Sequence, residues 1–359
     1  MKIAVAMSGG IDSSVSAVLL KNRGFDIVGI TAKLSDSSKY LPPDAPGSFN
    51  SGKSIDDAKK VCNDLGIRHY VIDLETDFSE KIITPFCRKY LSGETPNPCI
   101  ICNANIKFNK LVDYAESIGC DRLATGHYAA IGHSNGKNRY FIKSAVDEKK
   151  DQSYFLFMIA QKYLSRILFP LGEYTKIQIR EIAHEYKLDI ADKPDSQEIC
   201  FIPDDDYKSF IFKFTGQKPV PGDIIRSNGE IIGRHNGIHS YTIGQRRGLG
   251  ISDKEPLYVI KIDAKNNRII AGYRDELFST GLIAENITYM KIEKFSNQTA
   301  YIKTRSTQKP VEAVLNEENE NLIVKFKEPL SQITPGQAVV AYNKDMEILG
   351  GAWIKSPID

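Results

Sequence analysis

The sequence predicts an α/β fold: a doubly wound parallel sheet, followed by a small central domain and a C-terminal antiparallel β-barrel. Up to Thr125, short apolar runs of strand length alternate with longer runs of helical periodicity, which is typical of a parallel sheet covered by helices. A glycine-rich turn joins the first strand to the first helix. After Pro221-Gly222 the pattern changes to short alternating runs separated by turn residues, which indicates antiparallel strands.

The first elements form a turn that is suited to bind phosphate. Lys2–Met7 has the pattern of a buried strand, and Asp12–Asn22 has apolar residues at helical spacing before Gly24 ends the helix. The run Ser8-Gly9-Gly10 therefore lies at a helix N-terminus, where backbone amides lack intrahelical acceptors and the helix dipole is positive. The run lacks the Gly-Lys-Ser/Thr ending of a Walker loop and the three spaced glycines of a dinucleotide fingerprint.

The following elements complete the predicted sheet. We expect strands at Ile27–Thr31, His69–Leu74 and Arg122–Thr125, with helices at Ile55–Leu65, Thr76–Tyr90 and Asn103–Ile118. Ligands of such sheets bind beyond the carboxyl ends of the strands, so the glycine turn and Thr125-Gly126-His127 are expected to meet at one crevice. Ser35–Ser54 is rich in Ser, Pro, Asp and Gly and has no periodicity, which predicts a mobile loop over that crevice.

The rest of the chain supplies the predicted second and third domains. A helical stretch is expected over Gln152–Lys187, and an irregular acidic segment over Asp189–Asp206. Short strands are expected at Tyr258–Ile262, Arg268–Ala271, Ala300–Thr304, Leu322–Phe326 and Ala338–Tyr342. The predicted domains are residues 1–165 for the parallel sheet, 166–275 for the central domain and 276–359 for the barrel.

Composition limits the classes of function. No apolar stretch approaches 18 residues, and no basic segment followed by an apolar one precedes the first strand, so we expect no membrane span, no secretory signal and a cytoplasmic location. A net charge of +2 means that nucleic acid must bind to local basic patches. The candidate patches are Lys137, Arg139, Lys143, Lys149 and Lys150, and Arg234, Arg246 and Arg247.

The six cysteines divide into structural and chemical candidates. Cys62, Cys87 and Cys120 lie in helix or helix-end patterns and are expected to be small buried side chains. In Thr95–Asn103, prolines stiffen a loop, and Asn103 is expected to cap the next helix, so that Cys102 lies at a helix N-terminus with a lowered pKa. Cys200 lies in a loop long enough to move. A zinc site would need a fourth ligand, and no second Cys-x-x-Cys pair is present.

Two resemblances follow from these motifs. The run Ser8–Ser14 resembles the PP-loop of ATP pyrophosphatases, which cleave ATP to AMP and pyrophosphate. Six motifs together resemble the tRNA-specific 2-thiouridylase family (MnmA/TrmU) over essentially the whole chain: Ala6–Ser13, Thr95–Phe108, Ala124–Tyr128, Lys150–Tyr154, Ser196–Ile202 and Tyr241–Arg247. The resemblance implies a tRNA-uridine 2-sulfurtransferase that replaces the 2-oxygen of the wobble uridine in tRNAs for Lys, Glu and Gln by sulfur, after ATP has adenylated that oxygen.

The resemblance also implies a role for each matching residue. Cys102 matches the nucleophile and Cys200 the persulfide carrier, which end as a disulfide that a reductant must reopen. Asp12 is the catalytic residue of the loop. Nucleotide and Mg²⁺ would be bound at Ala6, Met7, Ser8, Gly9, Gly10, Ile11, Asp12, Ser13, Leu34 and Gly126. Contacts with tRNA would be made by Asn97, Pro98, Cys99, His127, Lys150, Asp151, Gln152, Arg305, Ser306 and Gln337. The implied partners are the tRNA anticodon stem-loop and a sulfur donor, either a cysteine desulfurase or a relay carrier. We expect a monomer, an oligomeric state that the sequence does not fix.

One position departs from the family pattern. Many members have Asp where this chain has Cys99. The cysteine removes a carboxylate beside the base, and it forms a Cys-x-x-Cys pair with Cys102 in a chain that also contains the distant Cys200. That arrangement resembles tRNA thiolases that hold a [4Fe–4S] cluster on three cysteines. Cys99, Cys102 and Cys200 are therefore alternative cluster ligands.

Other functions stay open on the sequence alone. They are a different PP-loop tRNA thiolase, such as a 2-thiocytidine synthetase; an amidotransferase-type ligase; and an inert, nucleotide-gated RNA-binding protein. An amidotransferase has no use for Cys102 and Cys200, and an inert protein has no need of an intact Asp12. Formation of AMP that depends on tRNA separates these classes.

Overall fold

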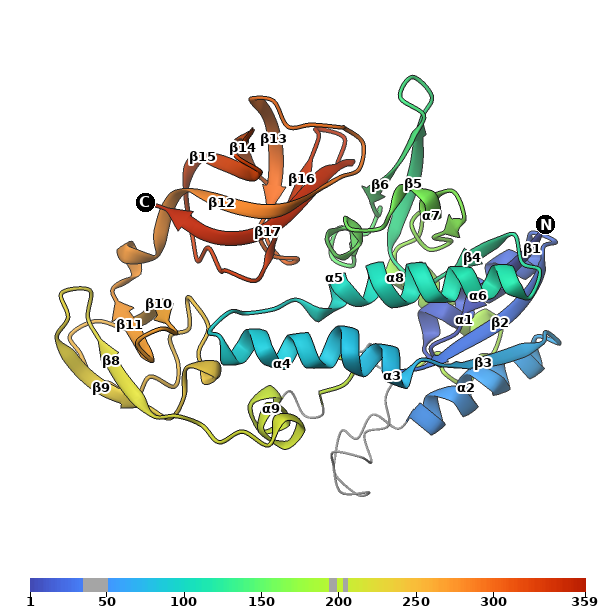
Figure 1. The fold of residues 1–359 in the computed structure, drawn as a ribbon. Coiled ribbons are helices and arrows are strands. Elements are labelled where there is room, and N and C mark those ends of the chain that lie inside the picture. Colours follow the sequence, from blue (N-terminus) through green and yellow to red (C-terminus); the bar gives the residue numbers. More distant parts are fainter. Residues whose placement is uncertain (35–50, 194–198, 203–205) are drawn as a thin grey trace. The chain divides into compact units, whose positions relative to one another are not determined.

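A computed structural model describes residues 1–34, 51–193, 199–202 and 206–359. They form two compact units (Figure 1): residues 1–83, 98–206 and 345–348, and residues 84–97, 207–344 and 349–359. The first unit contains the parallel sheet, and the second contains a small sheet and a closed barrel. The predicted fold class is confirmed.

The parallel sheet has five strands in the order β3-β2-β1-β4-β7. They are β1 (Lys2–Ala6), β2 (Asp26–Lys33), β3 (His69–Asp73), β4 (Arg122–Ala124) and β7 (Ile167–Leu168). The chain reverses its direction of winding between the neighbours β1 and β4, and ligands of open parallel sheets bind at such a reversal. Helix α1 (Ile11–Asn22) begins directly after β1 and buries Val15, Val18 and Leu20 in the core of this unit.

Three helical regions have boundaries that differ from the prediction. Helix α2 (Ser51–Asp64) begins earlier than expected and contains the end of the predicted Ser35–Ser54 loop; residues 35–50 lie outside the described residues. Helix α3 (Glu75–Phe78), a π-helical turn at Ser79–Ile83 and α4 (Thr84–Leu91) follow one another without a break. The third region consists of helix α5 (Pro98–Cys102), a π-helical segment at Asn103–Lys110 and α6 (Leu111–Ser117). Its backbone is non-helical at Phe108.

The predicted helix over Gln152–Lys187 is wrong as a continuous element. The segment contains a 3₁₀ turn (Ser153–Leu156), α7 (Gln161–Leu164), strand β7 and α8 (Lys176–Glu185). The β5–β6 hairpin (Ala129–Ser134 and Arg139–Ser144), which the sequence analysis did not assign, precedes it. Because β7 pairs with β4 and α8 packs on α1, residues after 165 belong to the same compact unit as the parallel sheet.

The second unit begins its C-terminal part with α9 (Tyr207–Thr215), which was not predicted. A four-stranded sheet follows in the order β10-β11-β8-β9, formed by β8 (Gly222–Ile225), β9 (Ile231–His235), β10 (Tyr258–Asp263) and β11 (Arg268–Gly272). It is antiparallel except for the parallel pair β11–β8. Ile224, Val259 and Ile269 are fully buried in its core.

The C-terminal barrel closes in the order β12-β15-β14-β13-β16-β17 (Figure 1). Its strands are β12 (Phe278–Tyr289), β13 (Gln298–Lys303), β14 (Val311–Glu318), β15 (Asn321–Ser331), β16 (Ala338–Tyr342) and β17 (Ile348–Ile358). The interior is filled by Leu282, Ile302, Leu315, Val324 and Val339, which are fully buried. Its lumen is therefore a packed core.

Candidate active site

The glycine turn has the geometry of an anion cradle. Gly9 has φ +71°, and Gly10 precedes the first residue of α1. The Ser8 N–H donates to the Ser13 hydroxyl at 3.2 Å, and the Ser13 and Ser14 hydroxyls both donate to the Gly10 carbonyl at 3.0 Å. These bonds hold the turn at the start of α1, whose first amides have no intrahelical acceptors. The glycine turn thus lies at a helix N-terminus, as predicted, and such a terminus is suited to an anion.

Asp12 lies in the first turn of α1 and is held by two side chains. Its Oδ1 accepts hydrogen bonds from the Tyr128 hydroxyl at 2.8 Å and the Lys176 ammonium at 2.7 Å. Tyr128 and Lys176 are only 2% and 8% exposed, whereas the Asp12 side chain is 33% exposed. The carboxylate is therefore fixed from the protein side and open on the other.

Gly126 and Gln152 connect the β4 end of the sheet to this carboxylate. A Cβ on Gly126 would lie 2.8 Å from the Asp12 carbonyl carbon and from the Ser13 nitrogen, so only glycine allows this approach. The Tyr128 N–H donates to Gln152 Oε1 at 3.0 Å, and the Gln152 N–H donates to the Tyr128 carbonyl at 2.9 Å. The glycine turn and Gly126 meet as predicted. Gln152, for which a tRNA contact is predicted, supports Tyr128 in this structure.

The neighbouring polar residues are also held by the protein. His127 Nδ1 lies 2.7 Å from the Thr125 hydroxyl, and its ring contacts those of Phe108 and Phe169. Burial, with a contribution from Lys107, holds the pKa of His127 well below its usual value, so the imidazole is neutral at physiological pH. Asp151 accepts hydrogen bonds from the Ala145 and Ser153 amides.

A second lysine contacts the cradle from the segment that leads to Cys200. The Lys193 ammonium donates to the Gly9 carbonyl at 2.9 Å and to Asp57 of α2 at 2.8 Å. Sequence reasoning missed Lys176 and Lys193, because nothing in the sequence near either residue marks it as close to the glycine turn. Tyr128 was visible only as part of the Gly-His-Tyr run.

Three thiols of the first unit come within electrostatic reach of one another. Cys99 and Cys102 lie three residues apart on α5, and therefore on the same helix face. Burial is the main cause of the raised pKa of Cys200, and the charges of Cys102 and Cys99 raise it further. Phe201 is 4% exposed and packs edge-on against Phe78 of α3 at 5.6 Å between ring centroids, which anchors the Cys200 segment. The structure thus brings together the three cysteines that the sequence analysis singled out.

The predicted lowering of the Cys102 pKa is wrong. The helix begins at Pro98, a favoured first helical residue, so Cys102 ends the first helical segment and does not face a helix N-terminus. Asn103 is no cap, because its side-chain amide donates to the Phe155 carbonyl at 3.1 Å. Burial raises the pKa of Cys102 to about 11, and burial followed by the neighbouring thiols raises that of Cys200 to about 12. Lys107 acts in the opposite direction on both thiols.

Cys99 and Cys200 differ from the remaining cysteines in their contact with solvent. Both keep exposed surface although the surrounding protein desolvates their thiolates and raises their pKa. Cys62, Cys87 and Cys120 are buried, and burial raises the pKa of each. Exposure therefore sets Cys99 and Cys200 apart from the three predicted structural cysteines, but Cys102 is buried as they are.

The pH dependence of alkylation tests this assignment. Because the thiolate is the reactive form and the pKa of Cys200 is raised to about 12, its rate of modification by iodoacetamide is expected to rise about tenfold per pH unit from pH 7 to 10 without a plateau. Lys107→Met removes a cation that lowers this pKa, so it should slow modification at every pH. A plateau below pH 9, measured by peptide mass spectrometry, would contradict the raised pKa.

The predicted metal ligands do not form a metal-ion site. In residues 1–34, 51–193, 199–202 and 206–359, no three His, Cys, Asp or Glu side chains are arranged to hold a metal ion. Cys99, Cys102 and Cys200 interact through their charges but lack that arrangement. The described conformation therefore does not fit a metal group on these three residues.

The tRNA-contact candidates of the barrel lie in the second unit. The Arg305 guanidinium donates to the Gln332 side chain, the Thr334 hydroxyl and the Ile243 carbonyl, so protein acceptors already engage it. Ser306 is partly exposed. The Gln337 side-chain amide donates to the Thr95 carbonyl at 2.9 Å, and the Thr95 N–H donates to the Pro335 carbonyl at 3.1 Å. Gln337 thus holds the segment that leads to Asn97.

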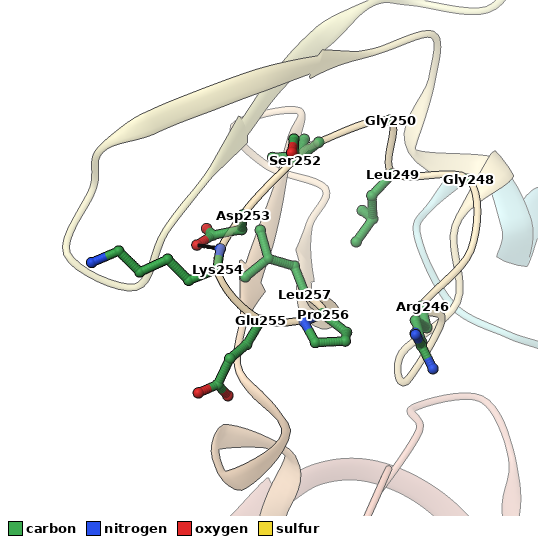
Figure 2. A pocket seen from close by; sticks show the side chains of 11 residues that line it. Arg246, Gly248, Leu249, Gly250, Ser252, Asp253, Lys254, Glu255, Pro256 and Leu257 are labelled. Carbon is green, nitrogen blue, oxygen red and sulfur yellow. Dashed lines mark hydrogen bonds between the residues drawn. The ribbon is translucent and has the colours of Figure 1, made fainter.

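A separate cavity of about 600 Å³ lies in the second unit, formed mainly by the loop Gly248–Leu257 (Figure 2). Arg246 and Lys254 line it together with Asp253 and Glu255, so the two charge signs balance. Arg226 forms an ion pair with Asp253, whose other oxygen accepts the Tyr273 hydroxyl at 3.2 Å. This cavity contains none of the residues that surround the glycine turn.

Within the described chain, no helix has the length and apolar character needed to cross a membrane.

Comparisons with known proteins cover nearly the whole chain. Residues 1–204 match the family model "tRNA methyl transferase HUP domain", residues 208–273 "tRNA methyl transferase PRC-barrel domain", and residues 279–354 "Aminomethyltransferase beta-barrel domain". The chain is 45% identical to tRNA-specific 2-thiouridylase MnmA 2 of Thermoanaerobacter pseudethanolicus, over 98% of this chain and 97% of that protein. It is 44% identical to tRNA-specific 2-thiouridylase MnmA of Pelotomaculum thermopropionicum, over 100% and 98%. The corresponding protein of Carboxydothermus hydrogenoformans is 43% identical over 99% and 97%.

Proposed function

This chain belongs to the tRNA-specific 2-thiouridylase family, and from that membership we propose that it thiolates the wobble uridine of tRNA with ATP and a persulfide on Cys200. Its activity is that of a tRNA-uridine 2-sulfurtransferase. The observation that carries the proposal is the presence, in one compact unit, of an anion cradle and two thiols that influence each other, Cys102 and Cys200. A binding module needs neither thiol, and an amidotransferase-type ligase needs only the cradle.

The first step uses the cradle. ATP binds with its phosphates on the amides of the Ser8–Asp12 turn, and adenine is placed between Leu34 and Gly126. Asp12 and Ser13 would supply oxygen ligands of the kind that Mg²⁺ prefers, and the Asp12 carboxylate is already oriented by Tyr128 and Lys176. The uridine 2-oxygen bonds to the α-phosphorus, the bond from that phosphorus to the bridging oxygen breaks, and pyrophosphate leaves with the electron pair.

The second step uses the cysteines. The terminal sulfur of the Cys200 persulfide bonds to C2, and AMP leaves with the 2-oxygen. The Cys102 sulfur then attacks Cys200, which forms a Cys102–Cys200 disulfide and leaves the new C=S bond on tRNA. Two electrons from a reductant reopen the disulfide. A persulfide is more acidic than a thiol, and this matters because the pKa of Cys200 as a thiol is raised to about 12.

The partners and the location follow from this chemistry. The tRNA anticodon stem-loop must present an unstacked base, with Asn97, Pro98 and Cys99 beside it and phosphate contacts from Lys150 and its neighbours. The exposed Cys200 is accessible to a sulfur donor, either a cysteine desulfurase or a relay carrier. We propose that the enzyme acts as a monomer in the cytoplasm.

One assay tests the proposal. With purified protein, ATP, Mg²⁺, a persulfide donor and tRNA that lacks the modification, AMP and 2-thiouridine are expected to form together, and both should require tRNA. Formation of AMP without tRNA would indicate a different ATP pyrophosphatase. Absence of both products from a protein that binds tRNA would indicate an inert binding module.

The convergence of three thiols favours one second candidate, in which a [4Fe–4S] cluster on Cys99, Cys102 and Cys200 holds the sulfur. In the described residues these three cysteines do not form a metal-ion site. After anaerobic purification, the persulfide scheme predicts negligible iron and acid-labile sulfide, with thiolation intact in the wild type and in Cys99→Asp. About four irons per chain, lost together with thiolation in Cys99→Asp, would overturn the persulfide scheme.

A further inference from the structure

Lys176 occupies a place that is unfavourable for a lysine on two counts. Its side chain is 10% exposed, and burying an ammonium ion costs free energy unless a partner compensates. It is also the first residue of α8, where the positive end of the helix dipole disfavours a cation. A lysine at this position therefore needs nearby negative charge, and a bound anion would supply more of it than Asp12 alone.

The local structure places the ammonium ion at the cradle with little freedom. The Thr175 hydroxyl and the Gln178 side chain form a capping box at the start of α8, and the Lys176 N–H donates to Asp147 at 2.9 Å. The ammonium ion lies 2.7 Å from Asp12 Oδ1 and 5.8 Å from the centre of the Tyr128 ring. Backbone, cap and side chain therefore all fix the position of Nζ beside the first turn of α1.

Two positive groups lie beside the Asp12 carboxylate. They are the N-terminus of α1, with its unsatisfied amides, and the Lys176 ammonium, whereas the N-terminus of α8 already has Asp147 as a partner. Asp12 is one negative charge and is open on one side. The potential at this place therefore suits additional negative charge, such as that of a polyphosphate.

We propose that Lys176 is a phosphate-contacting residue of the ATP site, and this rests on the proposed function. When the nucleotide enters the cradle, the ammonium ion bonds to a phosphate oxygen while it stays beside Asp12. As the bond between the α-phosphorus and the bridging oxygen breaks, negative charge grows on the leaving pyrophosphate and Lys176 stabilises it. The lysine stays protonated throughout and transfers no proton.

Kinetics of three variants test the proposal. Lys176→Met should lower kcat/KM for ATP in tRNA-dependent AMP formation by at least about 100-fold, while the Kd for tRNA stays within about twofold. Lys176→Arg, which keeps the charge, should recover at least about tenfold of that loss. Lys187→Met, on an exposed residue just beyond the same helix, serves as the matched control and should behave as wild type. ATP kinetics of the wild type in Lys176→Met, or equal losses in the Met and Arg variants, would overturn the proposal.

A second measurement needs no variant and does not depend on thiolation. An acyl-phosphate derivative of ATP transfers its acyl group to an amine near the phosphates: the nitrogen of the neutral amine bonds to the acyl carbon and loses its proton to water, and the nucleotide leaves with the phosphate oxygen. Incubated with the wild-type protein, this probe should acylate Lys176, and excess ATP should prevent the reaction. Labelling of other lysines with Lys176 unmodified would overturn the inference. If AMP and thiouridine fail to form although Lys176 is labelled, the proposed function fails and the phosphate contact stands.

Discussion

Replacing Cys102 with serine is expected to lower the rate of 2-thiouridine formation by at least about 10³-fold, while AMP formation that depends on tRNA stays measurable. In the proposed mechanism the thiol releases the sulfur from Cys200, whereas the adenylation of the uridine requires no thiol. A hydroxyl cannot form a disulfide, so the reaction stops after the sulfur has reached C2. AMP leaves when the sulfur bonds to C2, so about one AMP per chain should form while the tRNA stays linked to Cys200 through a disulfide.

Cys200→Ser should have the same effect on thiolation, because it removes the atom that carries the sulfur. Binding of tRNA to either variant should stay within about threefold of wild type, since neither thiol contributes charge at neutral pH while its pKa is about 11 or higher. Cys120→Ser is the matched control, on a buried cysteine of the same compact unit. Thiouridine and AMP are measured in one reaction by mass spectrometry. Thiolation by Cys200→Ser with a persulfide donor would show that Cys200 carries no sulfur.

Gly9→Ala is expected to lower kcat/KM for ATP by about 100-fold or more, because the cradle must change shape to accept it. Gly9 has φ +71°, and a Cβ on it would lie 2.4 Å from the backbone carbonyl oxygen of Ser54 in α2. Backbone cannot move aside as the end of a flexible side chain can. The turn or the start of α2 must therefore shift, which displaces the amides that bind phosphate.

Gly24→Ala separates this clash from the cost of the backbone conformation. Gly24 has φ +79° and nothing within 4 Å of its Cβ position, so alanine there pays only the conformational cost, about 1 kcal/mol. Both variants should lose thermal stability, but only Gly9→Ala should lose ATP turnover. Measuring Tm and the kinetics of AMP formation for both variants separates the steric clash at Gly9 from the conformational cost. Wild-type turnover in a folded Gly9→Ala protein would show that the turn tolerates the displacement.

The parts of the fold that the sequence predicted are those fixed by local pattern. The apolar run before Ser8 and the helical spacing after Gly10 determine β1, α1 and the cradle between them. The helix predicted over Gln152–Lys187 failed because its short apolar runs fit a helix and a strand equally well. Ile167–Leu168 is a two-residue strand, and only its pairing with β4 distinguishes it from a helical turn.

The site was predicted where a motif carries the chemistry and missed where tertiary packing does. Cys99, Cys102, Cys200 and Asp12 stand in recognisable runs, whereas Lys176 has no local signal, because its burial is decided by the packing of α8 on α1. The error on the Cys102 pKa has a local cause. The helix starts at Pro98 and not after Asn103, so burial outweighs the helix dipole that the prediction relied on.

The hydrogen bonds around Thr95 have a consequence for the order in which this enzyme is made. The turn Pro335–Gln337 holds both the N–H and the carbonyl of Thr95, and Ile354 of the last strand in turn holds Gln337 and Gly336. The partners of Thr95 thus leave the ribosome some 240 residues later, a delay of roughly 10 to 50 s at ordinary rates of synthesis. Until then the stretch that leads to Asn97 and Pro98 lacks its anchors. A nascent chain can therefore form its glycine turn early, but the segment around Thr95 gains its anchors only after Ile354 has been made.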